Sequence, residues 1–354
     1  MPRVDTGRVS RTLRAGVVGY GLGGRVFHVP VLRAAGIEVS HVVTRDPGRA
    51  AEAREAVPGV EVVTSLEALL AEPGRPDLVV LTTPSGLHAE QALQVVEAGV
   101  PVVVDKPLAT SAETARALLS SAERAGVPLT VYQNRRWDDE QRTLRAVLDS
   151  GELGRVHRFE RRWERWRPVP RSRWKETDPV GGGLVLDLGS HLVDAALQLF
   201  GPVASVYAEI RSLSTAADDD VFLALTHRSG VVSHLQAGGL VPVPGPRTRV
   251  LGDRAGFLVL GFEGDETPFA ELDGGRQVGG WLVRGAERTP VPVAPGEHAD
   301  FYRAVVPWLL DGAPPPVDPW DAVRVLEVLD AARLSAAERR LVEIDPVDNG
   351  APAR

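Results

Sequence analysis

The chain has 354 residues, of which 44% are hydrophobic and 25% charged, so it is long enough for two domains and excludes a peptide or a disordered tail. It contains no cysteine, which excludes disulfides, thiolate nucleophiles and zinc–thiolate sites and makes a reducing cytoplasm the expected location. The net charge of -7 argues against a nucleic-acid partner, because phosphate binding needs clustered cations.

No apolar run approaches the roughly 18 residues of a membrane span, so we expect a soluble protein with no membrane partner. The first 15 residues lack the apolar stretch of a secretory signal and are interpreted as a loose leader. From Leu13 to about Tyr132, short apolar strands alternate with helical stretches, which predicts a parallel sheet with helices on both faces. The expected strands are 14–19, 38–44, 60–63, 78–82, 102–104 and 129–132, and the expected helices are 65–70, 88–98 and 111–125.

A glycine-rich turn follows the first expected strand and leads into a helix: Gly19-Tyr-Gly21-Leu22-Gly23-Gly24. In that context the pattern is a dinucleotide fingerprint. Gly19 permits the tight turn, Gly21 lets backbone approach the pyrophosphate, and Gly24 allows close packing of helix on strand. The helix N-terminus supplies N–H donors and a positive dipole. The sequence therefore predicts a bound dinucleotide.

The end of the second expected strand indicates which dinucleotide. NAD sites usually place an acidic residue there for the ribose 2'-hydroxyl, whereas Thr44-Arg45 stands here. A hydroxyl and a guanidinium suit a 2'-phosphate, so we predict NADP(H). NAD remains possible, since a shift of register would place the carboxylate of Asp46 at the same point.

Asp105-Lys106-Pro107 lies at the carboxyl end of another parallel strand, the edge where ligands of such sheets collect. Only Lys106 and Lys175 among the 40 basic residues are lysine. An ammonium, unlike a guanidinium, is compact and can lose its proton near neutral pH. Lys106 is therefore a candidate site residue; the alternative is a solvated surface lysine.

After Asn134 longer strands dominate, which predicts a separate α+β domain with a large, mainly antiparallel open sheet. We place the two domains at 12–133 and 134–345. The expected strands are 155–166, 205–214, 221–227, 231–238 and 247–260, with a hairpin turn at 227–230, and the expected helices are 140–150, 184–200, 299–310 and 319–336.

Apolar residues alternate at Val221 and Leu223 and again at Val231 and Leu235. We interpret them as part of an exposed sheet face that a second copy of the chain would cover. The expectation is a homodimer or homotetramer.

The helix expected at 184–200 carries Asp187 and His191, which share a face at a spacing of four. The carboxylate could orient the imidazole beside a substrate. With Asp194 the pair could instead hold a metal, but Asp194 turns off that face, and we predict no metal site. A purely structural Asp–His pair is the remaining alternative.

Arginines from Arg155 to Arg173 are interleaved with Trp163, Trp166 and Trp174. Such a stretch could stack on single-stranded bases. It also fits a half-exposed strand followed by a pocket-lining loop, which is the interpretation we favour.

These motifs together resemble the Gfo/Idh/MocA oxidoreductases over nearly the whole chain. The resemblance rests on the fingerprint continuing as Val-Phe-His-Val-Pro at 26–30, on Thr82-Thr83-Pro84-Ser-Gly-Leu-His88, on Asp105-Lys106-Pro107 and on Asp187 to His191. Asp105 replaces the glutamate that is usual in this family. Asn134-Arg-Arg-Trp-Asp138 and Arg173-Trp174 are most similar to NADP-dependent scyllo-inositol 2-dehydrogenases.

The resemblance implies hydride transfer between a nicotinamide and a small polyol or sugar, inositol-like in the first place. His191 would be the base, oriented by Asp187, and Lys106 would stabilise the alkoxide. Implied cofactor contacts are Gly19, Gly21, Leu22, Gly23, Gly24, Thr44, Arg45, Thr83, Pro84, His88, Asp105 and Lys106; implied substrate contacts are Lys106, Asn134, Arg173, Trp174, Asp187 and His191. The alternatives are a dehydrogenase of an aldose, dihydrodiol or ketosugar, and a nucleotide-binding regulator without catalysis.

Overall fold

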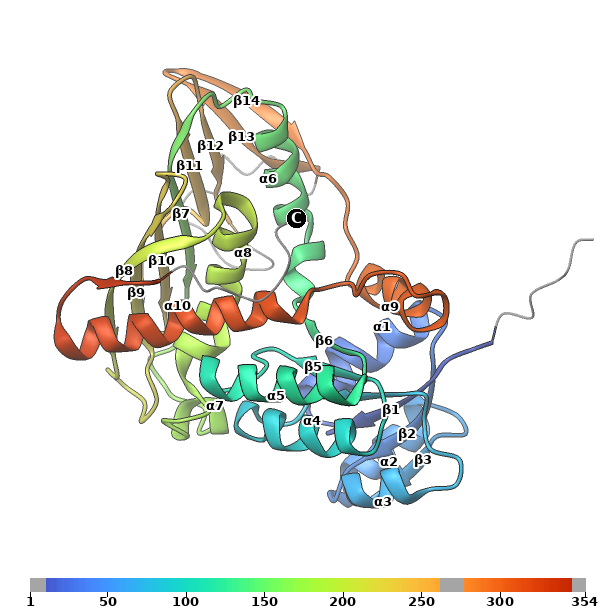
Figure 1. Cartoon of the computed structure of the whole chain (residues 1–354). Coiled ribbons are helices and arrows are strands. Elements are labelled where there is room, and N and C mark those ends of the chain that lie inside the picture. Colours follow the sequence, from blue (N-terminus) through green and yellow to red (C-terminus); the bar gives the residue numbers. More distant parts are fainter. Residues whose placement is uncertain (1–10, 262–276, 346–354) are drawn as a thin grey trace, which may run out of the picture.

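The computed structural model describes residues 11–261 and 277–345, so most of the expected leader lies outside the described residues (Figure 1). The first of two sheets is parallel, with the strand order β3-β2-β1-β4-β5-β6. Its strands are β1 (Arg14–Val18), β2 (Glu38–Val43), β3 (Glu61–Val63), β4 (Leu78–Leu81), β5 (Val102–Asp105) and β6 (Leu129–Tyr132). This confirms the predicted parallel sheet. Because the order reverses between β1 and β4, a crevice opens at the carboxyl ends of these strands.

Several helices of this unit begin and end at residues that are typical helix caps. They are η1 (Gly23–His28), α1 (Val29–Ala34), α2 (Pro47–Ala56), α3 (Leu66–Ala71), η2 (Ser85–Leu87), α4 (His88–Glu97) and α5 (Ala112–Ala125). The Ser111 hydroxyl accepts a hydrogen bond from the N–H of Thr114 at the start of α5, and Gly126 ends that helix in the left-handed conformation, with φ +64°. We did not predict α2, which Asp46 caps by accepting a hydrogen bond from the N–H of Arg49.

The second sheet is large and mainly antiparallel, as predicted, in the order β14-β13-β12-β11-β7-β10-β9-β8-β15. Only the β7–β10 pair is parallel within the described residues. The strands are β7 (Val156–Glu164), β8 (Val203–Arg211), β9 (Asp220–His227), β10 (Val232–Gly238), β11 (Thr248–Gly252), β12 (Gly256–Val259), β13 (Val278–Arg284), β14 (Glu287–Pro292) and β15 (Val342–Glu343). The single strand expected at 247–260 is wrong: the chain turns between Gly252 and Ala255, where the Gly252 N–H donates to the Ala255 carbonyl.

Helices cover one face of this sheet (Figure 1). The helical segments after residue 133, some of which cover this face, are η3 (Asn134–Trp137), α6 (Asp139–Asp149), α7 (Trp174–Thr177), η4 (Val185–Gly189), α8 (Ser190–Phe200), α9 (Ala299–Asp311) and α10 (Pro319–Glu338). Val221, Leu223, Val231 and Leu235 are buried in the same cluster as the side chains of α8 and α10. The prediction that these four form an exposed apolar face is therefore wrong. They alternate because they pack against the chain's own helices.

The C-terminal helices join the two sheets into one body. Figure 1 shows α10 lying between the sheets, where it contacts α5 on one side and β8 on the other. Phe301 and Tyr302 of α9 pack with Tyr132 and Leu32 in the core of the first unit. None of the helices in the described ranges combines the length and apolar character needed to cross a bilayer. The cleft between the two sheets is thus held by packing on both sides.

Candidate active site

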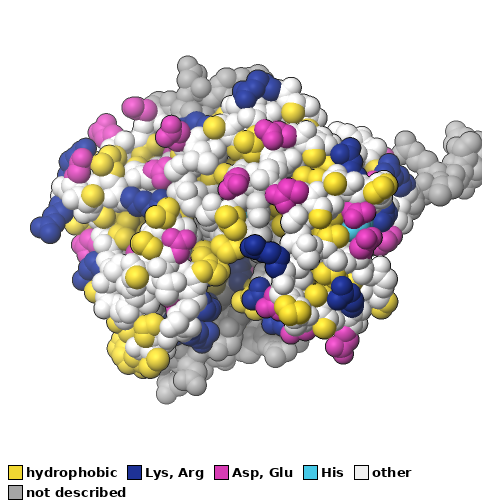
Figure 2. All heavy atoms as spheres, turned by 90° about the horizontal axis from the view of Figure 1, so that it is seen from below, with side chains coloured by type: hydrophobic (Ala, Val, Ile, Leu, Met, Phe, Trp, Pro, Cys, Tyr) yellow, Lys and Arg dark blue, Asp and Glu magenta, His cyan; other side chains and the backbone are white. Residues whose placement is uncertain are grey.

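A cleft of about 1180 Å³ lies between the crevice of the parallel sheet and the second sheet. It is lined by the glycine-rich turn, by the ends of β2, β4 and β5, by the start of α8 and by the loop of residues 165–183, which contains α7. Figure 2 shows a hollow on this face with Lys and Arg side chains at its rim. The volume is ample for a dinucleotide together with a small substrate.

The glycine-rich turn has the shape that a pyrophosphate needs. Gly19 has φ +95°, and a Cβ there would lie 3.1 Å from the Thr82 hydroxyl oxygen, which itself donates to the Gly19 carbonyl at 2.6 Å. A Cβ on Gly24 would overlap the Gly19 carbonyl, whereas a Cβ on Gly21 would meet nothing within 4 Å. The turn is therefore crowded toward the protein and open toward the cleft, which Leu22 and Gly23 also line. The residues present fit a dinucleotide.

The end of β2 presents basic groups to the cleft. Thr44, Arg45 and Arg49 line it. The carboxylate of Asp46 is engaged as the cap of α2, accepting from the Arg49 N–H at 2.9 Å, and it is not part of the cleft lining.

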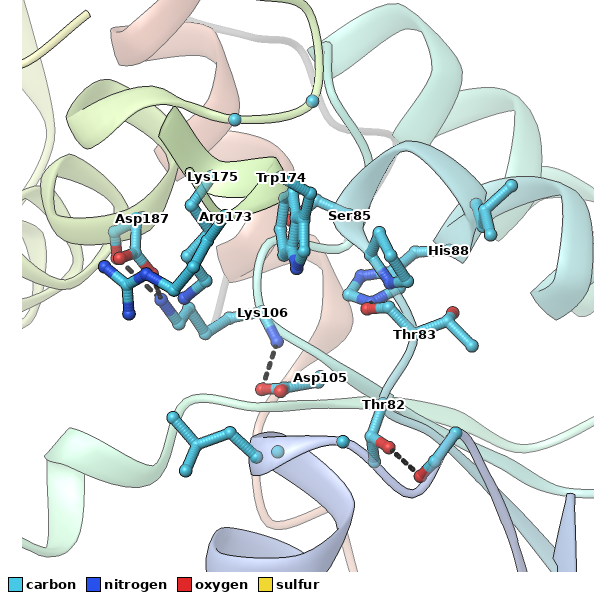
Figure 3. A pocket seen from close by; sticks show the side chains of 18 of the residues that line it. Thr82, Thr83, Ser85, His88, Asp105, Lys106, Arg173, Trp174, Lys175 and Asp187 are labelled. Atoms are coloured by element: carbon cyan, nitrogen blue, oxygen red, sulfur yellow. Dashed lines mark hydrogen bonds and ion pairs between the residues drawn. The ribbon is translucent and has the colours of Figure 1, made fainter. Parts of the chain in front are cut away.

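Thr83, Pro84 and His88 line the cleft after β4. His88 is buried, with Nδ1 2.7 Å from the Pro107 carbonyl oxygen and Nε2 2.8 Å from that of Thr83. It therefore ties the segments that follow β4 and β5, beside the cleft (Figure 3). A positioning role accounts for His88 without any cofactor contact.

Asp105 ends β5 directly below Lys106 (Figure 3). Its carboxylate accepts a hydrogen bond from the Lys106 N–H at 2.8 Å and lies 3.6 Å from Nε2 of the buried His28. Burial raises the pKa of Asp105, but the neighbouring His28 and Lys106 more than compensate and hold it below its usual value. Asp105 is thus a fixed negative charge at the floor of the cleft.

Asp187 pairs with lysines and not with His191, contrary to the prediction. Its Oδ1 accepts from Lys106 Nζ at 3.1 Å and from Lys175 Nζ at 2.5 Å, and Lys106 Nζ also donates to the Asp187 carbonyl at 2.6 Å (Figure 3). Burial alone would raise the pKa of Asp187, but the two ammonium groups depress it strongly. Burial and the charge of Lys175 lower the pKa of Lys106, although Asp187 opposes them.

The expected Asp187–His191 geometry fails because η4 is one turn of π-helix. In a π-helix the hydrogen bonds run from i to i+5, so residues four apart no longer lie one above the other. His191 instead stacks on Trp163, with ring centroids 5.7 Å apart, and its Nδ1 has no hydrogen-bond partner among the described residues. Burial and the positive charge of Lys106 keep the pKa of His191 well below its usual range.

Asp194, the third residue of the alternative metal site, binds elsewhere. Both of its carboxylate oxygens accept hydrogen bonds from Arg136, at 2.6 and 3.0 Å.

The stretch rich in arginine and tryptophan is a strand followed by a pocket-lining loop, as we favoured. Trp163 at the end of β7 is buried, with the guanidinium of Arg247 4.7 Å from its ring centroid. Arg173 and Trp174 begin α7 and line the cleft, as does Asn134 from η3. The Arg173 guanidinium forms an ion pair with Glu176 of α7.

Our sequence analysis gave Lys175 no role in the site, although it carried a signal as one of only two lysines in the chain. The family resemblance implied that the tryptophans from Trp163 to Trp174 lie near the substrate, but nothing in the sequence indicated that Trp163 stacks on His191.

Comparison with known proteins agrees with this geometry. Residues 13–133 match the family model described as "Oxidoreductase family, NAD-binding Rossmann fold", and residues 141–258 match the "GFO/IDH/MocA C-terminal domain". The chain is 32% identical to the scyllo-inositol 2-dehydrogenase (NADP(+)) of Bacillus subtilis over 94% of this chain and 96% of that one. It is 28% identical to the D-apiose dehydrogenase of Paraburkholderia graminis over 90% of this chain and 86% of that one.

Among solved structures, an oxidoreductase of Bacillus subtilis superposes with a TM-score of 0.85 at 31% identity, covering 96% of this chain and all of that one. These alignments extend over both units of this chain. The chain is an oxidoreductase of the Gfo/Idh/MocA family, with an NAD(P)-binding Rossmann unit and the C-terminal unit of that family.

Proposed function

We propose that the protein is an NADP(H)-dependent dehydrogenase that acts on a secondary alcohol of a cyclic polyol or sugar, with an inositol as the leading candidate. The observation that carries the proposal is the convergence of Lys106, Asp187 and His191 in the cleft that the glycine-rich turn opens into. A buried ammonium, a carboxylate and a neutral imidazole are the groups that alcohol oxidation needs.

The nicotinamide, when bound, accepts or supplies the hydride. His191, kept neutral at pH 7 by its lowered pKa, takes the proton from the substrate hydroxyl during oxidation and returns it during reduction. The Lys106 ammonium stabilises negative charge on the substrate oxygen. Trp163 stacks on the imidazole and holds its plane. Asp187 acts on Lys106 and holds its Nζ in place.

The choice of NADP(H) is supported by the end of β2. Arg45 and Arg49 provide two guanidinium groups for a 2'-phosphate, and Asp46, the one carboxylate that could favour NAD there, is engaged in capping α2. The Bacillus subtilis relative is named for NADP(+).

A polyol or sugar substrate is supported by the relatives, which are named for scyllo-inositol and for D-apiose. In this chain the substrate contacts we propose are Lys106, Asn134, Arg173, Trp174, Asp187 and His191. A regulator without catalysis is disfavoured, because the groups that carry the chemistry stand together in the cleft.

The test is a spectrophotometric assay of inositols, aldoses and dihydrodiols, each with NADP+ and separately with NAD+. We expect turnover of scyllo- or myo-inositol with a preference for NADP+. Turnover of an aldose or dihydrodiol alone would support a dehydrogenase but contradict the inositol as its substrate. Measurable nucleotide binding without turnover of any compound would contradict the proposal and favour the regulator.

We also propose that the chain forms a homodimer or homotetramer. No helix among the described residues covers the second face of the large sheet, where Glu160 pairs with Arg162 at 3.0 Å and with Arg249 at 2.6 Å (Figure 1). Light scattering at micromolar concentration tests this expectation, and a monomeric mass would contradict it.

A further inference from the structure

Both lysines of the chain bind the same carboxylate oxygen. Lys106 reaches Asp187 Oδ1 from the end of β5, and Lys175 reaches it from α7 in the 165–183 loop. The Lys106 side chain is 11% exposed and that of Lys175 is 37% exposed. Figure 3 shows the three side chains side by side, with Arg173 and Trp174 next to them. One carboxylate thus joins the floor of the cleft to the loop that overhangs it.

We propose that Lys175 is a positioning residue of the active site, which holds Asp187 against Lys106 and keeps a second positive charge beside the ammonium that faces the substrate. It acts through Asp187 and touches neither the nicotinamide nor the reacting carbon. This inference rests on the proposed function only for the role of Lys106 in catalysis; the coupling of the three side chains stands without it.

The geometry requires such a residue. Asp187 sits on a turn of π-helix, and among the described residues its carboxylate is held by its two lysine partners. Both lysines donate to Oδ1, so without Lys175 that buried carboxylate would keep the ammonium of Lys106 as its one positive partner and would be less well compensated. Asp187 and Lys106 would stay paired but would be held less firmly in place.

The charge of Lys175 has a second effect. A like charge disfavours the ammonium form of Lys106 and lowers its pKa, and burial acts in the same direction. Removing that charge must therefore move the titration of Lys106 to higher pH. The other titratable and charged groups near the pair are Asp105 at the end of β5, His88 at the start of α4 and His191 at the start of α8, and Arg135 in η3 acts in turn on His191.

The chain allows a direct test, since each substitution of Lys175 leaves one lysine. We would label the protein with lysine carrying carbon-13 at Cε and follow the single signal of Lys106 against pH in Lys175→Arg and in Lys175→Met. The arginine keeps the charge on Asp187 and the methionine removes it, at similar length. We expect the Lys106 signal to titrate at higher pH in Lys175→Met. Identical titrations in the two folded variants would overturn the proposal.

Kinetics give the second measurement. Lys175→Met should lower kcat by up to about 100-fold because Asp187 and Lys106 are placed less firmly, with little change in nucleotide affinity, and Lys175→Arg should restore most of the rate. The control is Arg288→Met, which removes a positive charge from the exposed strand β14, outside the cleft lining. We expect it to leave kcat and the titration unchanged, and an equal loss in the control would refute a specific role for Lys175. If Lys175→Met does not bind nucleotide, Lys175→Gln replaces it.

The two measurements separate the two proposals. The lysine titration needs no substrate, so it decides the coupling even if no polyol is turned over. An altered titration without turnover would leave this inference standing while the proposed function fails.

Discussion

His191 depends on its neighbours for its chemistry. Its imidazole lies on the Trp163 ring, is largely removed from water, and has the Lys106 ammonium nearby. Burial and the Lys106 charge disfavour the imidazolium, so the ring is neutral at pH 7 and can accept a proton. During oxidation the neutral form must be present, so activity should fall only as the pH drops below the ordinary range of histidine.

Replacing His191 with alanine should reduce turnover by about 10² to 10⁴, the usual contribution of a general base. Nucleotide affinity should barely change, because the imidazole belongs to α8 and not to the glycine-rich turn. Steady-state kinetics with the best polyol, together with NADP+ titration by fluorescence, check both expectations. A variant with normal kcat would remove His191 from the mechanism.

Lys106→Arg keeps the positive charge but changes its shape and acidity. The planar guanidinium does not fit the contacts that Nζ makes with the carboxylate and the carbonyl of Asp187, so we expect a marked loss of kcat. The alkaline limb of the wild-type profile should also vanish, since a guanidinium does not titrate there. Full activity would show that a plain cation suffices at this position.

The site could be predicted from the sequence where a residue type alone implies its use. Lys106 and His191 were predicted in this way, and the structure places both in the cleft. The lysine partners of Asp187 could not be predicted. They depend on one turn of π-helix at Asp187 and on the fold of the loop that carries Lys175, 12 residues before Asp187. Helical spacing cannot show either feature.

At the scale of elements, our proposal for the cofactor rests on the junction of β2 and α2. A short loop presents Arg45 to the cleft, while the first turn of α2 holds Asp46 as its cap. Helix capping thus withdraws the carboxylate that would otherwise compete for the ribose. Adjacent residues thus serve two needs: Asp46 caps α2, and Arg45 is available for the proposed contact with the 2'-phosphate.

Arg45→Ala should weaken NADP+ binding by about 10- to 100-fold, the worth of a hydrogen bond to a charged group, and leave NAD+ binding nearly unchanged. Parallel calorimetric titrations with the two nucleotides measure the difference. Equal losses for both would show that Arg45 serves the common part of the cofactor. Tight binding of NAD+ by the unaltered protein would refute our interpretation of this junction.

The elements themselves were predictable to different degrees. Strands of the parallel sheet are continuous apolar runs between glycines and polar turns, and all six were predicted within a residue or two. The 247–260 segment contains Gly252-Asp-Arg at its turn, a signal for the break between β11 and β12 that our prediction of a single strand overlooked. Strands β13 and β14 contain glycines and prolines that weaken any strand pattern, and pairing along the sheet edge stabilises them.

For the whole molecule, the decisive feature is a continuous core. One buried cluster includes Val104 and Leu118 of the first unit, Phe159 and Leu223 of the second, and Leu326 of α10. Two units that share their core and a bridging helix cannot unfold independently without exposing apolar surface on the partner.

We therefore expect a single calorimetric unfolding transition, with matching calorimetric and van't Hoff enthalpies. Saturating NADP+ should raise Tm without splitting the peak, because the ligand binds only the folded chain. Two resolved transitions would show that the units are energetically separate despite their packing.

The distribution of amines over the molecule has a chemical consequence. Apart from the amino terminus, the only primary amines are those of Lys106 and Lys175, and both lie on Asp187 in the cleft. Acylation of amines and imine formation with aldehydes and ketones, which spread over many surface lysines in most proteins, can reach a side-chain amine only at this site. The arginines of the surface form no such amides or imines, so for this protein any lysine-directed modification is an event in the cleft.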